Sequence, residues 1–253
     1  MMAGRTMRVT AVIIATGAVA APCASAGVRV DYKQMFTTQV PGKSTGTDVR
    51  LLYKNPNDPK GKPIRVRREE FTLPAGTTYD QTVVPDCTAS DAEILLFGMS
   101  ACPAASHIGS SQGATSMSGF GAGEDPIDLD FWDDAGVLVL WGRSHQFPAI
   151  GAVSRGHQKG QTMTVDVPRS PGGPPDGESA VRRVHNVFPA RSAGRRAFVR
   201  TPRTCPKSGR WTFRAKFTFA DGAVERDVYR MRCKRAAPRR HRTARLRTHA
   251  DDD

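Results

Sequence analysis

Six carboxylate side chains lie close together in residues 124–134. Oxygen ligands at this spacing could hold Ca²⁺, and two carboxylates at a set separation are what glycosidase chemistry requires. The order of residues lacks the glycine and the distal glutamate of an EF-hand loop. Solvent-facing strand positions and a hairpin turn explain the same pattern, so we predict no metal and no cofactor. The calcium candidates are Asp125, Asp128, Asp130, Asp133 and Asp134.

Two further patterns resemble catalytic motifs. Residues 109–113 match G-x-S-x-G, the nucleophile elbow in which a strand-to-helix turn exposes a serine. The residues that follow are poor helix formers, so we expect a flexible loop there. The histidines show no metal-binding or catalytic spacing and are interpreted as surface or hydrogen-bonded residues. They are His107, His145, His157 and His185. Catalysis stays open, and the balance favours a protein that is not an enzyme.

The first 26 residues have the pattern of a secretory signal peptide. Arg5 and Arg8 precede an apolar run over residues 9–21, and Ala24-Ser25-Ala26 forms a cleavage pattern before Gly27. The run is shorter than the roughly 20 residues that span a bilayer. We therefore expect a secreted or extracellular protein with no membrane span after cleavage, and association with the cell envelope is an open alternative.

Four cysteines follow the predicted signal peptide, which favours two disulfides in an oxidising compartment. Three pairings are formally possible. Local pairing is predicted because Cys87 and Cys102 flank one expected helix, and Cys205 and Cys233 flank one expected hairpin. The absence of a C-x-x-C pattern argues against zinc.

A short helix is expected between the first two of these cysteines. Ser90 and Glu93 have the spacing of a capping box, and Gly98 is a natural helix end. Ile94, Leu95 and Phe97 would form its buried apolar side. The disulfide would staple a helix too short to be stable alone.

Most of the remaining chain reads as short strands. Residues 127–131 alternate and residues 137–141 are continuously apolar, which predicts a hairpin whose second strand is covered on both faces. Residues 211–219 also alternate, so their odd positions are predicted core: Trp211, Phe213, Phe217 and Phe219. Residues 109–123 are either a loose strand pair or a mobile loop. Ten to twelve strands predict an all-β, antiparallel β-sandwich, jelly-roll-like or Ig-like, in one domain over residues 27–233.

Two motifs in this region resemble a family of uncharacterised secreted proteins of high-GC bacteria. The first runs from Cys87 through Ser90-Asp91, Gly98 and Cys102-Pro103 to Ser106 and Ile108-Gly109. The second is T-P-x-T-C-P-x-S-G-x-W over residues 201–211. The resemblance implies a secreted, all-β protein and assigns no catalytic residue.

Positive charge exceeds negative charge by 13 across the chain. Residues 234–253 form a basic tail, which few apolar residues and dense like charge predict to be disordered. Such a tail could bind an anionic envelope polymer or polysaccharide by releasing counterions, or could simply keep the protein in solution. The candidate contacts are Arg239, Arg240, Arg242, Arg245 and Arg247.

These features predict a secreted binding or structural module of the cell envelope or extracellular space. The alternative is a secreted hydrolase or lyase that acts on a polysaccharide, with the carboxylates of residues 125–134 at its centre. A cleft lined by carboxylates and exposed aromatic rings would favour the enzyme. A closed fold with dispersed acids would favour the module.

Overall fold

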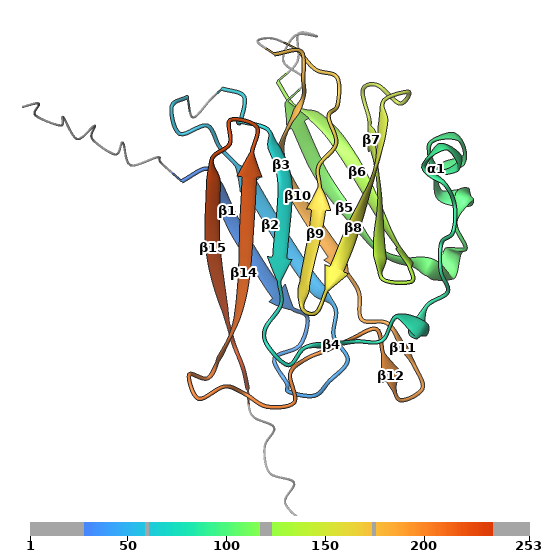
Figure 1. Cartoon of the computed structure of the whole chain (residues 1–253), viewed down its shortest axis with the longest axis vertical. Helices are drawn as coiled ribbons and strands as arrows, with labels where there is room; N and C mark the ends of the chain where they lie inside the picture. Colours follow the sequence, from blue (N-terminus) through green and yellow to red (C-terminus); the bar gives the residue numbers. More distant parts are fainter. Residues whose placement is uncertain (1–27, 59–60, 117–122, 174–175, 235–253) are drawn as a thin grey trace, which may run out of the picture.

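A computed structural model describes residues 28–58, 61–116, 123–173 and 176–234. The predicted signal peptide and nearly all of the predicted basic tail lie outside these residues. Eleven strands form one antiparallel sheet in the order β1-β2-β10-β5-β6-β7-β8-β9-β3-β14-β15 (Figure 1). Their bounds are β1 Val30–Phe36, β2 Thr47–Tyr53, β3 Val66–Thr72, β5 His107–Ser116, β6 Asp125–Asp134, β7 Val137–Ser144, β8 Gly151–Lys159, β9 Thr162–Asp166, β10 Ala180–Phe188, β14 Arg210–Phe219 and β15 Val224–Arg232.

Four short strands form two small sheets beside the large one. They are β4 Thr78–Tyr79, paired with β13 Val199–Arg200, and β11 Ser192–Ala193, paired with β12 Arg196–Ala197. The helical segments are α1 Asp91–Phe97 and three single 3₁₀ turns, Gln81–Val83, Gly98–Ala101 and Ala104–Ser106. Among the residues that the structure describes, no helix is long and apolar enough to cross a membrane.

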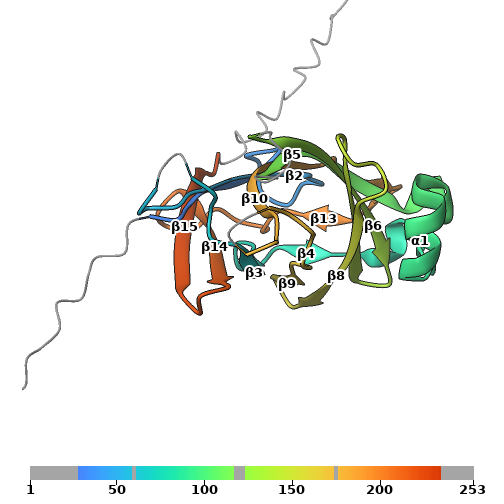
Figure 2. The ribbon, with the colours of Figure 1, turned by 90° about the horizontal axis from the view of Figure 1, so that it is seen from above.

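The large sheet curves until its two edge strands, β1 and β15, lie side by side (Figure 2). Because neighbouring strands are all antiparallel and their number is odd, the two edge strands run in the same direction. Side-chain and flanking hydrogen bonds join them: the Glu225 carboxylate accepts from the backbone N–H of Arg29 at 2.9 Å and of Val30 at 3.2 Å, and Lys234 N–H donates to Gln39 O at 2.9 Å. We call this nearly closed sheet the near-barrel.

The expected sandwich of two stacked sheets is not confirmed, because hydrogen bonds join all eleven strands into one sheet. The sheet is continuous because two strands pair with neighbours that are distant in sequence. β10 lies between β2 and β5, and β3 lies between β9 and β14. Alternation in the sequence identifies the inward face of a strand but not its neighbours, so these two insertions could not be anticipated.

The prediction that the odd positions of residues 211–219 are buried is confirmed in β14. Trp211, Phe213, Phe217 and Phe219 are each at most 2% exposed. Their rings pack against the opposite wall of the near-barrel, where Phe213 contacts Phe36 of β1 and Phe217 contacts Tyr53 of β2. This face of β14 therefore supplies a large part of the apolar interior.

The β6–β7 hairpin is also confirmed. Ala135 and Gly136 form its turn with φ of 47° and 91°, the positive values that a tight hairpin turn needs. The continuously apolar β7 is covered on both faces, as predicted. Leu138 and Leu140 face the interior, while Val139 and Trp141 pack on the outside with the segment of α1.

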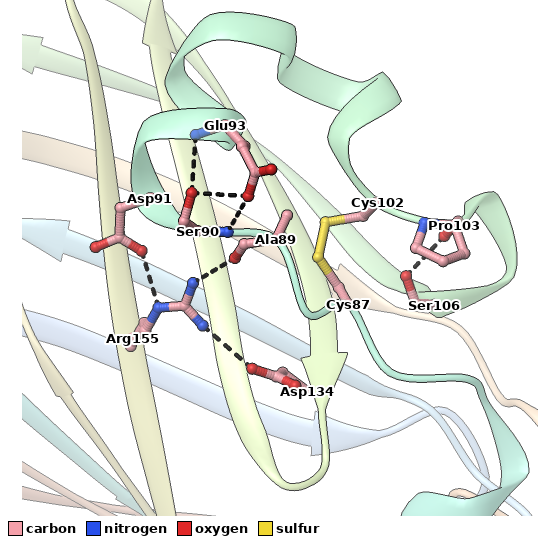
Figure 3. The surroundings of a disulfide bond; sticks show 10 residues. All are labelled: Cys87, Ala89, Ser90, Asp91, Glu93, Cys102, Pro103, Ser106, Asp134 and Arg155. Carbon is pink, nitrogen blue, oxygen red and sulfur yellow. Dashed lines mark hydrogen bonds and ion pairs between the residues drawn. A yellow bond between two sulfur atoms is a disulfide. The ribbon is translucent and has the colours of Figure 1, made fainter.

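Helix α1 lies on the outer face of the near-barrel (Figure 1). Its capping box of Ser90 and Glu93 and the Cys87–Cys102 disulfide are both present (Figure 3). Ile94 is buried as expected, but the prediction that Leu95 and Phe97 are buried is wrong, because these side chains are about half exposed. The helix is so short that only one of its side chains is fully buried against the sheet.

The other disulfide joins Cys205 to Cys233, so both predicted pairs are present. The expectation of a flexible loop at residues 109–113 is wrong. These residues lie within β5, which is paired with β10 on one side and β6 on the other. Gly113 is required there by close packing, since a Cβ atom would lie 2.6 Å from the carbonyl oxygen of Arg183. A serine in a doubly paired strand is not a nucleophile elbow.

We predict that Phe217→Ala lowers the free energy of unfolding by roughly 3 to 5 kcal/mol, because it empties a ring-sized space in the apolar interior. Urea denaturation followed by circular dichroism measures this change. Arg214→Ala, on the exposed face of the same strand, is the matched control and should change stability by less than about 0.5 kcal/mol. Equal denaturation midpoints for the Phe217 variant and the wild type would contradict the prediction.

Candidate functional site

Two cavities lie inside the near-barrel, with volumes of about 140 Å³ and about 120 Å³. Their order along the strands places them toward opposite ends. On β6 the first is lined by Asp125 and the second by Asp133, and we name them the Asp125 cavity and the Asp133 cavity. Four residues line both: Glu69, Leu140, Val165 and Asn186. These four residues lie where the two cavities adjoin, and we refer to the cavities as the two lobes of the interior.

Glu69 of β3 is the ionisable group among the four residues that line both cavities. The hydroxyl of Tyr53, on β2, reaches across the interior and donates a hydrogen bond to Glu69 Oε1. Burial raises the pKa of Glu69 to about 7, and the hydrogen bond from Tyr53 opposes part of this increase. The same burial, together with the adjacent carboxylate, raises the pKa of Tyr53 well above its usual value, so its hydroxyl stays protonated. Asn186 adds a buried side-chain oxygen that has no hydrogen-bond partner among the described residues.

Asp125 and Asp133 sit near opposite ends of β6 and are 1% and 3% exposed. Asp125 Oδ1 accepts a hydrogen bond from the backbone N–H of Gln146 at 3.1 Å. The Oδ2 atoms of both aspartates are buried without a partner in the described part of the chain. Burial raises the pKa of Asp133 to about 6, and the neighbouring Asp86 adds to the increase. Each lobe therefore has one buried carboxyl of its own in addition to Glu69.

The carboxylates proposed from sequence as calcium ligands are divided between the two faces of the sheet. Asp125 and Asp133 line the interior, whereas the other three pair with basic side chains away from the cavities. These pairs are Asp128 with His145 at 2.8 Å, Asp130 with His107 at 3.0 Å and Asp134 with Arg155 at 3.3 Å. Within the described ranges, no three His, Cys, Asp or Glu side chains are grouped so that they could hold a metal ion.

The histidines do not meet at a common site. His107, His145 and His185 each pair with a different aspartate, and His157 is exposed. The arginines of the predicted tail site lie outside the described residues. None of these four histidines lines either cavity.

Sequence reasoning missed Tyr53, Glu69 and Asn186 as site residues. One signal could have identified Glu69. The pair Glu69-Glu70 interrupts the alternation that runs from residue 64 to residue 73, and Glu69 occupies an inward position in line with Phe71 and Leu73. A carboxylate at a core position of a strand is costly unless it has a role or a partner. Tyr53 and Asn186 gave no comparable signal, because polar tips are common in strands.

No family model, no curated protein and no solved structure matches this chain. The resemblance to secreted proteins of high-GC bacteria therefore stays a prediction. We therefore infer a function from the two cavities and the polar groups that line them.

We predict that Glu69→Gln stabilises the protein more at alkaline than at acid pH. The unfolded chain releases the Glu69 proton near pH 4.5, whereas the folded chain holds it to about pH 7. The wild type therefore loses stability as pH rises through this interval, by an amount on the order of 3 kcal/mol. Glutamine has no proton to lose and can still accept the hydrogen bond from Tyr53, so the variant lacks this loss.

Urea denaturation near pH 5 and near pH 8 measures the effect. The control is Glu70→Gln, because Glu70 is paired with Lys216 at 2.7 Å and lines neither cavity. The stability of Glu69→Gln relative to wild type should increase between the two pH values, and that of Glu70→Gln should not. A difference for Glu69→Gln that is constant with pH would disprove the assignment.

Proposed function

We propose that this protein is a binding module that holds a small, largely apolar molecule inside the near-barrel. The observation behind the proposal is the pair of interior cavities that share Glu69 and Asn186. Small-molecule sites are typically concave and apolar, with a few convergent polar groups that fix the orientation of the ligand. The interior of the near-barrel has this composition.

The volumes limit the size of the ligand. An apolar cavity of about 150 Å³ in another protein binds benzene. Each lobe, at about 140 and about 120 Å³, therefore accommodates a group of roughly one aromatic ring. A ligand that occupies both lobes would be elongated and would place a polar group beside Glu69.

We also propose that the protein works outside the cytoplasm. Two disulfides support this, because such bonds persist mainly in oxidising compartments. The predicted signal peptide agrees with the proposal but lies outside the described residues. Binding of the basic tail to an anionic envelope polymer is for the same reason still a prediction.

The alternative, a polysaccharide hydrolase or lyase, has less support. The large aromatic side chains of β14 are packed in the core and do not form an exposed platform. The carboxylates of β6 are divided between the interior and the outer face, and each lobe has the size of about one ring. A polysaccharide chain would need a continuous open groove.

We predict that the wild-type protein binds 4-fluorotoluene and that Val165→Phe abolishes this binding. Val165 lines both lobes and is 6% exposed, so a larger side chain there fills the space between them. Broadening of the ¹⁹F NMR signal of the probe measures binding. Thermal denaturation of each variant, measured in parallel, verifies that it is folded.

The matched control is Val187→Phe, because Val187 is on the exposed face of β10 and lines neither lobe. This variant should bind the probe as the wild type does. Leu140→Ala provides a second measurement in case Val165→Phe is overpacked: it enlarges both lobes and should strengthen binding of the larger 1-fluoronaphthalene. Absence of probe binding to folded wild-type protein would refute the proposed function.

A further inference from the structure

The two lobes differ in the chemistry of their walls. Among the described residues, the Asp133 cavity is lined by two carboxyl groups, Glu69 and Asp133, and by no lysine, arginine or histidine. Its wall also includes five aromatic rings, which are Phe71, Tyr79, Phe131, Phe188 and Phe198. The described residues that line the Asp125 cavity include Arg65 and Arg143 but no aromatic side chain.

In the part of the chain that the structure describes, no cationic side chain pairs with the carboxyl groups of the Asp133 cavity. The hydrogen bond that Glu69 makes is with the neutral hydroxyl of Tyr53. Asp133 Oδ2 has no partner among the described residues. The carboxylates of Asp86 and Asp134 add to the effect of burial in raising the pKa of Asp133, and a backbone hydrogen bond from Gly136 opposes them. Asp134 is itself paired with Arg155. This contrasts with a chain whose net charge is +13, in which basic side chains are plentiful.

In the Asp125 cavity the situation is different. Arg65 is 8% exposed and its Nε atom donates to Glu178 at 2.6 Å, so a buried cation and its counter-ion are both supplied by the protein. Around the Asp133 cavity the described residues supply carboxyl groups and no cation. Burial of carboxylates without a counter-ion costs free energy, and either a bound proton or a bound cation must offset that cost.

Aromatic rings indicate which kind of cation fits. The faces of aromatic rings attract cations, and cages of several rings are the usual way in which proteins recognise alkylated ammonium groups. A small metal ion would need several oxygen ligands, and no such group of side chains occurs among the described residues. An organic ammonium ion can neutralise the carboxylates with its charge and pack its alkyl groups against the aromatic rings.

We propose that the Asp133 cavity binds the alkylammonium group of an organic cation, with Glu69 and Asp133 as its counter-ions and the aromatic rings as its apolar contacts. This inference rests on the proposed function, because it identifies the chemical class of the ligand that the interior takes. A volume of about 120 Å³ accommodates a head group such as trimethylammonium. The uncharged remainder of the ligand extends past Glu69 toward the Asp125 cavity.

The test compares choline with 3,3-dimethylbutan-1-ol, which has the same shape but a tert-butyl group in place of the trimethylammonium group. Isothermal titration calorimetry near pH 8, where buried carboxyls of the Asp133 cavity are ionised, gives the two dissociation constants. We expect choline to bind at least roughly tenfold more tightly than the alcohol. Equal affinity for the two compounds overturns the inference.

Variants separate the charge of the site from its shape. Asp133→Asn should lower the affinity for choline roughly tenfold and leave the affinity for the alcohol unchanged. Its matched control is Asp130→Asn, since this aspartate lies on the same strand, lines neither cavity and pairs with His107. Glu69→Gln should act on choline as Asp133→Asn does. A loss of stability alone would weaken both compounds together, so an unchanged ratio of affinities in both variants also overturns the inference.

Titration with 4-fluorotoluene distinguishes failure of this inference from failure of the proposed function. If the neutral probe binds and choline does not, the interior is a binding site that does not select ammonium ions, and only the present inference is overturned. If none of the compounds binds to folded protein, both proposals are overturned.

Discussion

Closure of the sheet is the constraint on which the interior depends. An open sheet of eleven strands has two edges and no enclosed space, and here the edges meet as parallel neighbours because the number of strands is odd. The Glu225 carboxylate binds two backbone N–H groups of the opposite edge, and Arg29 adds an ion pair with Asp221 at 2.8 Å. A few charge-assisted hydrogen bonds thus replace the missing ladder and hold the two edges of the near-barrel together.

Strand alternation then determines what each side of the wall does. In β6, Asp133 faces the interior and lines a cavity, while Asp134 pairs with Arg155 outside it. A shift of one residue in the register would exchange these two environments and would leave Asp134 buried without Arg155. The same rule places Glu69 inside and Glu70 beside Lys216. In each pair of adjacent acids, strand alternation therefore places one carboxyl in the interior and the other beside a cationic side chain outside it.

The sequence predicted the features that depend on local pattern. The capping box, the hairpin at Gly136, the buried face of β14 and both disulfide pairs are all determined by residues near one another in the chain. The single sheet was not predicted, because the positions of β3 and β10 depend on pairing between distant segments. The cavities were missed for the same reason: Glu69, Asp133 and Tyr53 come from three strands that only closure brings around one interior.

The disulfide-linked helical segment on the outer face is bonded to β6 at the residues next to the Asp133 cavity. Cys87 N–H donates to the carbonyl oxygen of Asp133 at 2.8 Å, and Arg155 of β8 links Asp91 and Ala89 O of the helical segment to Asp134 (Figure 3). The helical segment is thus attached to the backbone of Asp133, whose side chain lines the cavity, and through Arg155 to the side chain of Asp134. Because a helix of this length is not stable alone, the Cys87–Cys102 disulfide helps to hold the segment whose Cys87 N–H binds the backbone of Asp133, a residue that lines the cavity.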